Sequence, residues 1–229
     1  MKARKFRAKA VLFDLWGTLG FSRDKKRFLH YVKLLAGFPV EEHGGKFSEI
    51  YENEMHRKKH PDPESELRAL FRGLKYSPSK SEFRKALYLY GKMRADIALY
   101  PETKRVLAEL KSRGFALCLV SNTSSFQSSA PKRLGISKFL DASIVSAEVG
   151  AIKPAKKIFL AALRELKLEP ADCIMVGDKP RTDIDGATKS GMRAILIDRI
   201  GRHSSAEGAI AKISSLEELL SLLESEEKK

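Results

Sequence analysis

The sequence predicts an α/β protein: a parallel sheet with helices on both faces, interrupted by an inserted block of helices. Two observations predict this fold. After residue 100, short apolar runs alternate with helical patterns, which is typical of parallel sheets covered on both faces. Between residues 22 and 98 the patterns are helical and no strand signal is present. A chain of 229 residues is long enough for one domain that carries such an insertion.

The first strand is predicted at residues 10–13. This run, Ala-Val-Leu-Phe, is apolar throughout and leads directly into Asp14, Gly17 and Thr18. Such a run is typical of a central parallel strand followed by a functional loop. Residues 1–9 carry five basic groups, and we expect them to form an exposed lead-in strand or tail.

Four amphipathic helices are expected in the inserted block. Glycine and proline separate them at residues 37–39 and 61–63, and Ser-Pro-Ser at 77–79 supplies a stop and a cap. The expected helices are residues 24–36, 46–60, 64–75 and 79–98.

The sheet continues after residue 100, so two separate sequence segments build the core. The expected strands are residues 115–120, 143–145, 173–176, 193–197 and a last one near 209–213. The expected helices are residues 102–113, about 126–134, 155–167, 182–190 and about 215–226.

The net charge of +14 arises from 43 basic and 29 acidic side chains. The excess is spread along the chain, with +4 in residues 1–20, +6 in 21–100 and +4 in 101–229. A nucleic-acid-binding arm would concentrate this charge, and no zinc-finger, helix-turn-helix or aromatic RNA-binding pattern is evident. We therefore expect no nucleic-acid partner, and at most a minor role for the charge in attracting an anionic substrate.

The sequence also indicates a cytoplasmic protein. No apolar run approaches the roughly 18 residues that span a bilayer, so no membrane association is expected. Cys118 and Cys173 each lie inside an apolar run and are expected to be core residues. Asn and Gln number only three, and this scarcity beside abundant Lys, Arg and Glu is typical of a thermophilic source. The oligomeric state is left open.

Polar residues follow several predicted strands at the edge where parallel sheets bind ligands. They are Asp14, Ser121, Lys153, Asp178 and Asp183. A single aspartate after a strand is often only a turn or cap residue, but five polar positions at one edge favour a site for phosphoryl transfer.

In that chemistry each residue has an expected role. Asp14 is the candidate nucleophile, and together with Asp178 and Asp183 it would hold a hard cation such as Mg²⁺. Lys153 would offset the negative charge of the nucleophile and phosphate. The hydroxyls of Ser121 and Thr18, and backbone amides of the loops at Gly17 and Asn122, would bind phosphate oxygens.

Four segments resemble the motifs of the haloacid dehalogenase-like hydrolase superfamily. They are Phe-Asp-Leu-Trp-Gly-Thr-Leu at 13–19, Val-Ser-Asn at 120–122, Ile-Lys-Pro at 152–154 and Val-Gly-Asp-Lys-Pro-Arg-Thr-Asp at 176–183. The resemblance implies a Rossmann-like catalytic core at residues 1–19 and 99–229. It also implies a four-helix-bundle cap at residues 20–98 and an aspartyl-enzyme intermediate on Asp14.

The sequence departs from the family's phosphatases at Trp16. In those enzymes an aspartate two residues after the nucleophile acts as general acid and base, and its loss typically costs about 10²–10⁴-fold in rate. The resemblance implies that the backbone carbonyl at this position is a metal ligand, which Trp16 retains.

Three functions therefore remain open. The first is a Mg²⁺-dependent phosphatase acting on a small phosphorylated substrate. The second is a 2-haloacid dehalogenase, because those enzymes resemble this chain in having an aromatic residue at the position of Trp16 and use no metal. The third is a weakly active or non-catalytic phosphate-binding protein. The pair Asp178 and Asp183 favours the phosphatase, since three gathered carboxylates repel one another without a cation.

Overall fold

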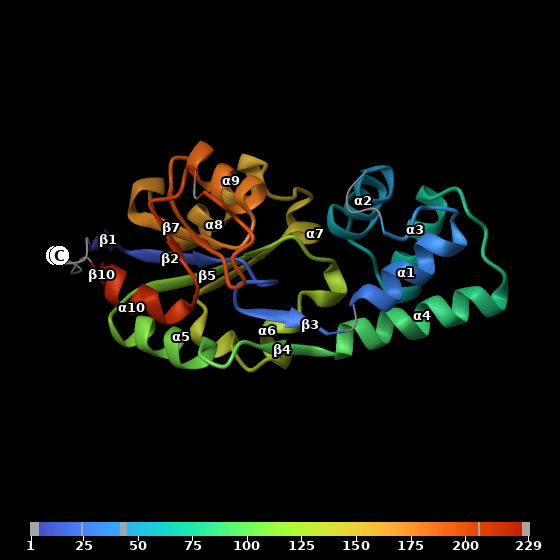
Figure 1. Cartoon of the computed structure of the whole chain (residues 1–229), viewed down its shortest axis with the longest axis horizontal. Helices are drawn as coiled ribbons and strands as arrows, with labels where there is room; N and C mark the ends of the chain where they lie inside the picture. Colours follow the sequence, from blue (N-terminus) through green and yellow to red (C-terminus); the bar gives the residue numbers. More distant parts are fainter. Residues whose placement is uncertain (1–4, 24, 42–44, 206, 226–229) are drawn as a thin grey trace.

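The core is a six-stranded parallel sheet in the strand order β6-β5-β2-β7-β8-β9. Its central strands β5, β2 and β7 are labelled in Figure 1. The computed structural model describes residues 5–23, 25–41, 45–205 and 207–225. The strands are β2 (Ala10–Phe13), β5 (Ala116–Ser121), β6 (Ala142–Val145), β7 (Cys173–Gly177), β8 (Arg193–Ile197) and β9 (Ala211–Ile213). The chain winds outward from β2 in both directions, so β2 lies at the switch point where doubly wound sheets bind ligands.

Helices cover both faces of this sheet, as the sequence predicts. Along β2, Val11 and Phe13 face one apolar cluster while Ala10 and Leu12 face the other. The two clusters are separate because side chains alternate between the faces of a strand. One face packs against α5 (Thr103–Ser112), α6 (Ala130–Arg133) and α10 (Leu219–Leu222); the other packs against α8 (Lys156–Leu166) and α9 (Asp185–Lys189).

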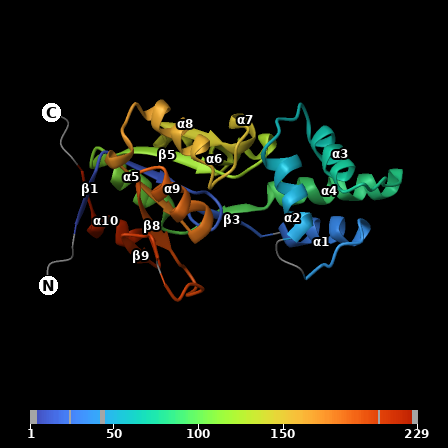
Figure 2. The ribbon, with the colours of Figure 1, turned by 90° about the horizontal axis from the view of Figure 1, so that it is seen from above.

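A block of helices stands beside the core and has its own apolar centre (Figure 2). It consists of α1 (Lys25–Leu35), α2 (Gly45–Tyr51), the π-helical turn η1 (Glu52–His56), α3 (Pro63–Gly73) and α4 (Lys80–Ala95). Asp62 caps α3, and Ser79 forms a reciprocal capping box with Glu82 at the start of α4. Phe28, Leu70 and Tyr90 are among the buried side chains that these helices share.

Two short strands join the block to the core, and the expectation of no strand between residues 22 and 98 is wrong here. β3 (Gly20–Ser22) and β4 (Ile97–Leu99) pair antiparallel, so the predicted helix at 79–98 ends early, at Ala95. A Cβ on Gly20 would lie 2.6 Å from the Ala98 carbonyl oxygen, so this close pairing requires glycine. Strands of three residues are too short to produce an alternating pattern in the sequence.

The predicted helix at residues 215–226 is also wrong in its last turn. The helical part ends with α10, and β10 (Leu223–Ser225) pairs in parallel with β1 (Phe6–Ala8). The lead-in strand expected within residues 1–9 is therefore present at 6–8, while residues 1–4 and 226–229 lie outside the described residues. This pairing joins the two distant ends of the core segments, which local periodicity does not reveal.

Both cysteines are buried free thiols on central strands, as expected. Among the described residues, no helix has both the length and the apolar character that crossing a membrane requires.

Candidate functional site

Three aspartates meet at the carboxyl ends of β2 and β7. Asp14 directly follows β2, and its backbone N–H donates to the Val176 carbonyl, 3.0 Å away on β7. Asp178 directly follows β7, and Asp183 lies in the π-helical turn η5 (Pro180–Ile184). One carboxylate oxygen from each aspartate lies within 4.8 Å of the others. The parallel sheet thus brings together residues that are more than 160 positions apart in the sequence.

Two glycines make room for these carboxylates. Gly17 has a φ of +89°, and a Cβ on it would lie 2.3 Å from the Asp178 carboxylate. A Cβ on Gly177 would lie 2.4 Å from the Asp183 side chain. Larger residues would therefore push the aspartates apart, and at Gly17 they would also be strained by the backbone conformation.

Lys153 lies between two of the aspartates and is almost completely buried. Its ammonium donates to Asp14 Oδ1 at 2.6 Å and to the Val120 carbonyl at 2.8 Å. It also forms an ion pair with Asp183 Oδ1 at 2.8 Å. These three acceptors satisfy all three ammonium protons.

Asn122 holds Lys153 in place. Its side-chain oxygen accepts from the Lys153 backbone N–H at 2.7 Å, and its side-chain nitrogen donates to the Lys153 carbonyl at 3.0 Å. The Asn122 side chain is thereby engaged with Lys153, a role that the sequence does not suggest. The predicted phosphate-binding role of this residue rests on its backbone amide alone.

The charges of the site are unbalanced: three carboxylates face the buried Lys153 ammonium, and the charge of Lys179 also opposes those of Asp14 and Asp178. Burial raises the pKa of Asp14, an effect that Lys153 opposes and Asp183 increases. Burial, together with the charges of Asp14 and Asp183, raises the pKa of Asp178 to about 7. Burial lowers the pKa of Lys153, but Asp14 and Asp183 outweigh this effect and raise it above its ordinary value. An additional cation would relieve the remaining repulsion.

Several buried oxygen atoms near these strand ends have no hydrogen-bond partner among the described residues. They are Oγ1 of Thr18, Oγ of Ser121 and Oδ1 of Asp178. Unsatisfied buried polar atoms are costly, so a native structure that keeps them usually pairs them with a ligand, an ion or water. Two hydroxyls suit the oxygens of an anion, and the carboxylate oxygen suits a cation.

The three aspartates fit a magnesium ion. All their donor atoms are oxygens, which Mg²⁺ prefers, and Oδ1 of Asp178 has no hydrogen-bond partner in the described part of the chain. The carbonyl of Trp16, two residues after Asp14, is the predicted fourth protein ligand, and this assignment stays a prediction.

The Trp16 side chain is engaged in a hydrogen bond and in apolar packing. Its indole N–H donates to Thr123 Oγ1 at 3.5 Å, and Thr123 in turn donates to Gln127 at 2.9 Å. The indole also packs against the apolar cluster on one face of the sheet. The indole nitrogen has no free lone pair to accept a proton, and its N–H is far less acidic than a carboxylic acid, so it cannot replace an aspartate as general acid or base.

The sequence interpretation missed Arg199, which supports the loop after β2. Arg199 donates to the Thr18 carbonyl at 2.7 Å and to Glu102 at 2.8 Å, and its guanidinium lies 3.5 Å from the centre of the Tyr100 ring. Arg199 comes two residues after β8, at the same edge of the sheet as Asp14. Because Arg199 follows the apolar run at residues 193–197, the sequence could have placed it at the ligand-binding edge of the sheet.

The chain is similar to proteins of one hydrolase family. The model of the haloacid dehalogenase-like hydrolase family matches residues 8–191. The glyceraldehyde 3-phosphate phosphatase of Methanothermobacter thermautotrophicus is 31% identical, over 93% of this chain and 99% of the relative.

Solved structures with the same fold include both phosphatases and dehalogenases. A phosphatase from Thermococcus onnurineus is 29% identical, with a TM-score of 0.65 over 92% of this chain and 95% of its own. A 2-haloacid dehalogenase from Pseudomonas syringae has a TM-score of 0.65 at 22% identity, over 94% of this chain and 97% of its own, and shows the shared fold alone. From the family match and the full-length relative together, the chain belongs to the haloacid dehalogenase-like hydrolase family.

Proposed function

We propose that the protein is a Mg²⁺-dependent phosphatase that hydrolyses a small phosphorylated substrate through an aspartyl-phosphate on Asp14. The observation that carries this proposal is the cluster in which Lys153 pairs with Asp14 and Asp183, while one oxygen of Asp178 has no hydrogen-bond partner among the residues that the structure describes. Relatives named as phosphatases, one of which matches nearly its full length, support the same reaction class.

In the first step, a carboxylate oxygen of Asp14 attacks the phosphorus atom. The bond from phosphorus to the ester oxygen breaks, and the leaving alcohol takes the electron pair and needs a proton. Lys153 favours the ionised form of Asp14, against the effect of burial, and offsets charge in the transition state. The hydroxyls of Thr18 and Ser121 orient the phosphoryl oxygens. In the second step, water attacks the phosphorus atom, which releases phosphate and restores the Asp14 carboxylate.

Asp14, Asp178 and Asp183 would hold the metal ion, with the Trp16 carbonyl as a further ligand. When bound, Mg²⁺ supplies positive charge that stabilises the phosphoryl group in its transition state. Burial, together with the charges of Asp14 and Asp183, raises the pKa of Asp178, which supports a cation as part of the site.

Because Trp16 cannot transfer a proton to the leaving alcohol, we expect the rate of the first step to depend on the acidity of that alcohol. Substrates whose leaving alcohol is already acidic, such as p-nitrophenyl phosphate, need little help. Alkyl phosphates need a proton from water or from the substrate itself, so we expect them to react more slowly.

We further propose that residues 20–98 act as a cap over a catalytic core of residues 1–19 and 99–229. Contacts between the two parts support the assignment of residues 20–98 as a cap. Tyr90 contacts Ser124 at 3.1 Å, Arg94 donates to the Phe126 carbonyl at 2.7 Å, and Lys59 pairs with Glu148 at 2.6 Å. The first two contacts lie on the loop after β5, which begins beside Ser121.

A 2-haloacid dehalogenase is the second candidate, and Trp16 is the observation that favours it. Displacement of a halide needs no proton on the leaving group, so an aromatic residue at this position does not impede it. The three clustered carboxylates oppose it, since this reaction needs no cation.

One assay separates the two candidates. The purified protein is incubated with p-nitrophenyl phosphate in Mg²⁺ or in EDTA, and separately with 2-chloropropionate. We expect phosphate release that requires Mg²⁺ and is abolished by Asp14→Asn. Metal-independent halide release without phosphatase activity would establish the dehalogenase instead.

A further inference from the structure

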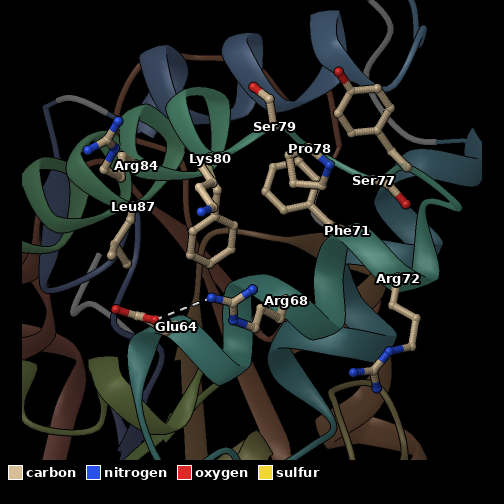
Figure 3. Close-up of a pocket in the computed structure, with 12 residues that line it drawn as sticks. Glu64, Arg68, Phe71, Arg72, Ser77, Pro78, Ser79, Lys80, Arg84 and Leu87 are labelled. Atoms are coloured by element: carbon tan, nitrogen blue, oxygen red, sulfur yellow. Dashed lines mark ion pairs between the residues drawn. The ribbon is translucent and has the colours of Figure 1, made fainter.

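A groove lies between α3 and α4 of the helical block (Figure 3). Its volume is about 720 Å³, inside the range of about 300–1,000 Å³ that is usual for small-molecule sites. None of the residues that line it belongs to the aspartate cluster, so the groove is separate from the catalytic site.

The groove is strongly basic. Arg68 and Arg72 line it from α3, and Lys80 and Arg84 line it from α4. Among the described residues that line the groove, Glu64 is the one acidic residue. Glu64 pairs with Arg68 at 3.6 Å. The other three cations have no ion-pair partner in the part of the chain that the structure describes. Each helix also places its two cations four positions apart, where like charges repel each other, so an anion in the groove would be stabilising.

The centre of the groove offers a flat surface. The Arg68 guanidinium lies over the Phe83 ring, 4.3 Å from its centre, while the Arg68 side chain itself is exposed. Figure 3 shows Arg68 and Lys80 extending from the two helices toward this centre, near Phe71 and Pro78. A guanidinium fixed over a ring leaves its outer face open, and aromatic bases stack on such planes.

The N-terminus of α4 adds further positive potential at one end of the groove. Ser79 caps this helix and lines the groove together with Lys80. The backbone N–H groups of a first helical turn attract anions, phosphates above all. The Glu82 carboxylate accepts from the Ser79 backbone N–H and from the Tyr76 hydroxyl, and both of these residues line the groove, so Glu82 offsets part of this positive potential.

We propose that this groove binds a nucleotide, with its base stacked on Arg68 and its phosphates facing Lys80, Arg84 and the start of α4. An apolar ligand would leave the three cations without a partner. A bare phosphate would leave the stacked plane of Arg68 and Phe83 unused. A molecule that joins an aromatic base to phosphates satisfies both parts of the groove.

The test is isothermal titration of the metal-free protein with ADP, and with pyrophosphate, which has the same number of phosphates but no base. Arg68→Ala removes the stacking plane, and Arg84→Glu removes a phosphate contact. Lys92→Glu is the matched control, because Lys92 is an exposed cation on the same helix that does not line the groove. Circular dichroism melts check that each variant is folded.

We expect one saturable site for ADP, weakened at least about tenfold by either groove variant, as expected for the loss of a charged contact. Lys92→Glu should leave the affinity within about twofold. Arg68→Ala should weaken ADP more than pyrophosphate, whereas Arg84→Glu should weaken both.

Four results would overturn the proposal. The first is an absence of saturable ADP binding. The second is binding that the groove variants leave unchanged, which would place ADP at the aspartate site. The third is an equal loss with Lys92→Glu, which would indicate general surface charge. The fourth is equal affinity for pyrophosphate and ADP, which would indicate an anion site without base recognition.

Discussion

Asn122 and Lys153 are joined by two hydrogen bonds, at 2.7 and 3.0 Å, between the side-chain amide of Asn122 and the backbone of Lys153. The ammonium of that lysine contacts Asp14, so Asn122 connects the loop after β5 to the proposed nucleophile. A fixed backbone at Lys153 is what allows one ammonium to reach Asp14 and Asp183 together.

Asn122→Ala should therefore lower kcat through the position of Lys153. Since small displacements of a reacting group cost up to about 10²-fold in rate, we expect a loss of about 10–100-fold in kcat with a smaller change in KM. Steady-state kinetics on p-nitrophenyl phosphate measure this. Asn122→Asp keeps the acceptor for the Lys153 N–H but sets a carboxylate oxygen against the Lys153 carbonyl, so it should not restore activity. An unchanged kcat in Asn122→Ala would refute the positioning role.

Lys153→Met should destabilise the fold as well as abolish activity. The variant leaves Asp14 and Asp183 buried without their shared ammonium, and an unpaired buried charge costs about 3–5 kcal/mol. Urea unfolding of the metal-free protein measures the loss. Lys156→Met, at an exposed position on α8, is the control and should change stability by less than about 0.5 kcal/mol. Equal stability of the two variants would contradict the electrostatic account of the site.

Glu66 should make the folded protein less stable as the pH rises, which is the reverse of the usual effect of a carboxylate. Burial raises its pKa above the ordinary 4.5, although Tyr90 donates to it at 2.7 Å and partly offsets the rise. The folded protein therefore favours the protonated form. Relative to Glu66→Gln, the wild type loses stability as the pH rises from 4.5 through the folded pKa.

Glu82 provides the matched control with the opposite sign. Hydrogen bonds from Ser79 and Tyr76 lower its pKa below the ordinary 4.5, so its ionised form stabilises the fold. Glu82→Gln should be less stable than the wild type at neutral pH, and the difference should vanish as the pH falls through the lowered pKa. Urea unfolding between about pH 4 and pH 8 spans the region where Glu66 is expected to act, and lower pH completes the curve for Glu82. If the stability difference from the wild type changed with pH in the same direction for Glu66→Gln and Glu82→Gln, the opposite pKa shifts assigned to these two residues would be refuted.

Trp16→Asp should restore a general acid and base. We expect alkyl phosphates to gain turnover by at least about tenfold, since this form of catalysis is worth about 10²–10⁴-fold. The gain for p-nitrophenyl phosphate should be smaller because its leaving group is acidic. Trp16→Asn has a similar shape to the aspartate variant without a titratable proton, so equal gains in both variants would show that the effect is steric.

The sheet could be predicted from sequence because its strands are buried on both faces. Such strands appear as continuous apolar runs, and their order is limited by the strand–helix alternation. The strands β3, β4 and β10 were missed because each has three residues and is specified by pairing with a distant segment. Local periodicity carries no information about such pairing.

The candidate site was partly predictable for a related reason. Asp14, Ser121 and Asp178 each end or follow a predicted strand, so a parallel sheet had to bring them to one edge. The side-chain role of Asn122 and the support that Arg199 gives to Thr18 depend on loop conformation, which the sequence does not specify. A cytoplasmic location, a thermophilic source and the absence of a nucleic-acid partner rest on composition and stay predictions.

The most direct test of the proposed reaction is the chemical state of Asp14 during turnover. The protein is mixed with p-nitrophenyl phosphate in Mg²⁺ or in EDTA, quenched in acid and digested, and the peptide that contains Asp14 is analysed by mass spectrometry. We expect the added mass of one phosphoryl group on Asp14 in Mg²⁺, with none in EDTA. Phosphate release in Mg²⁺ with the phosphoryl group on another residue, or no phosphate release at all, would contradict it.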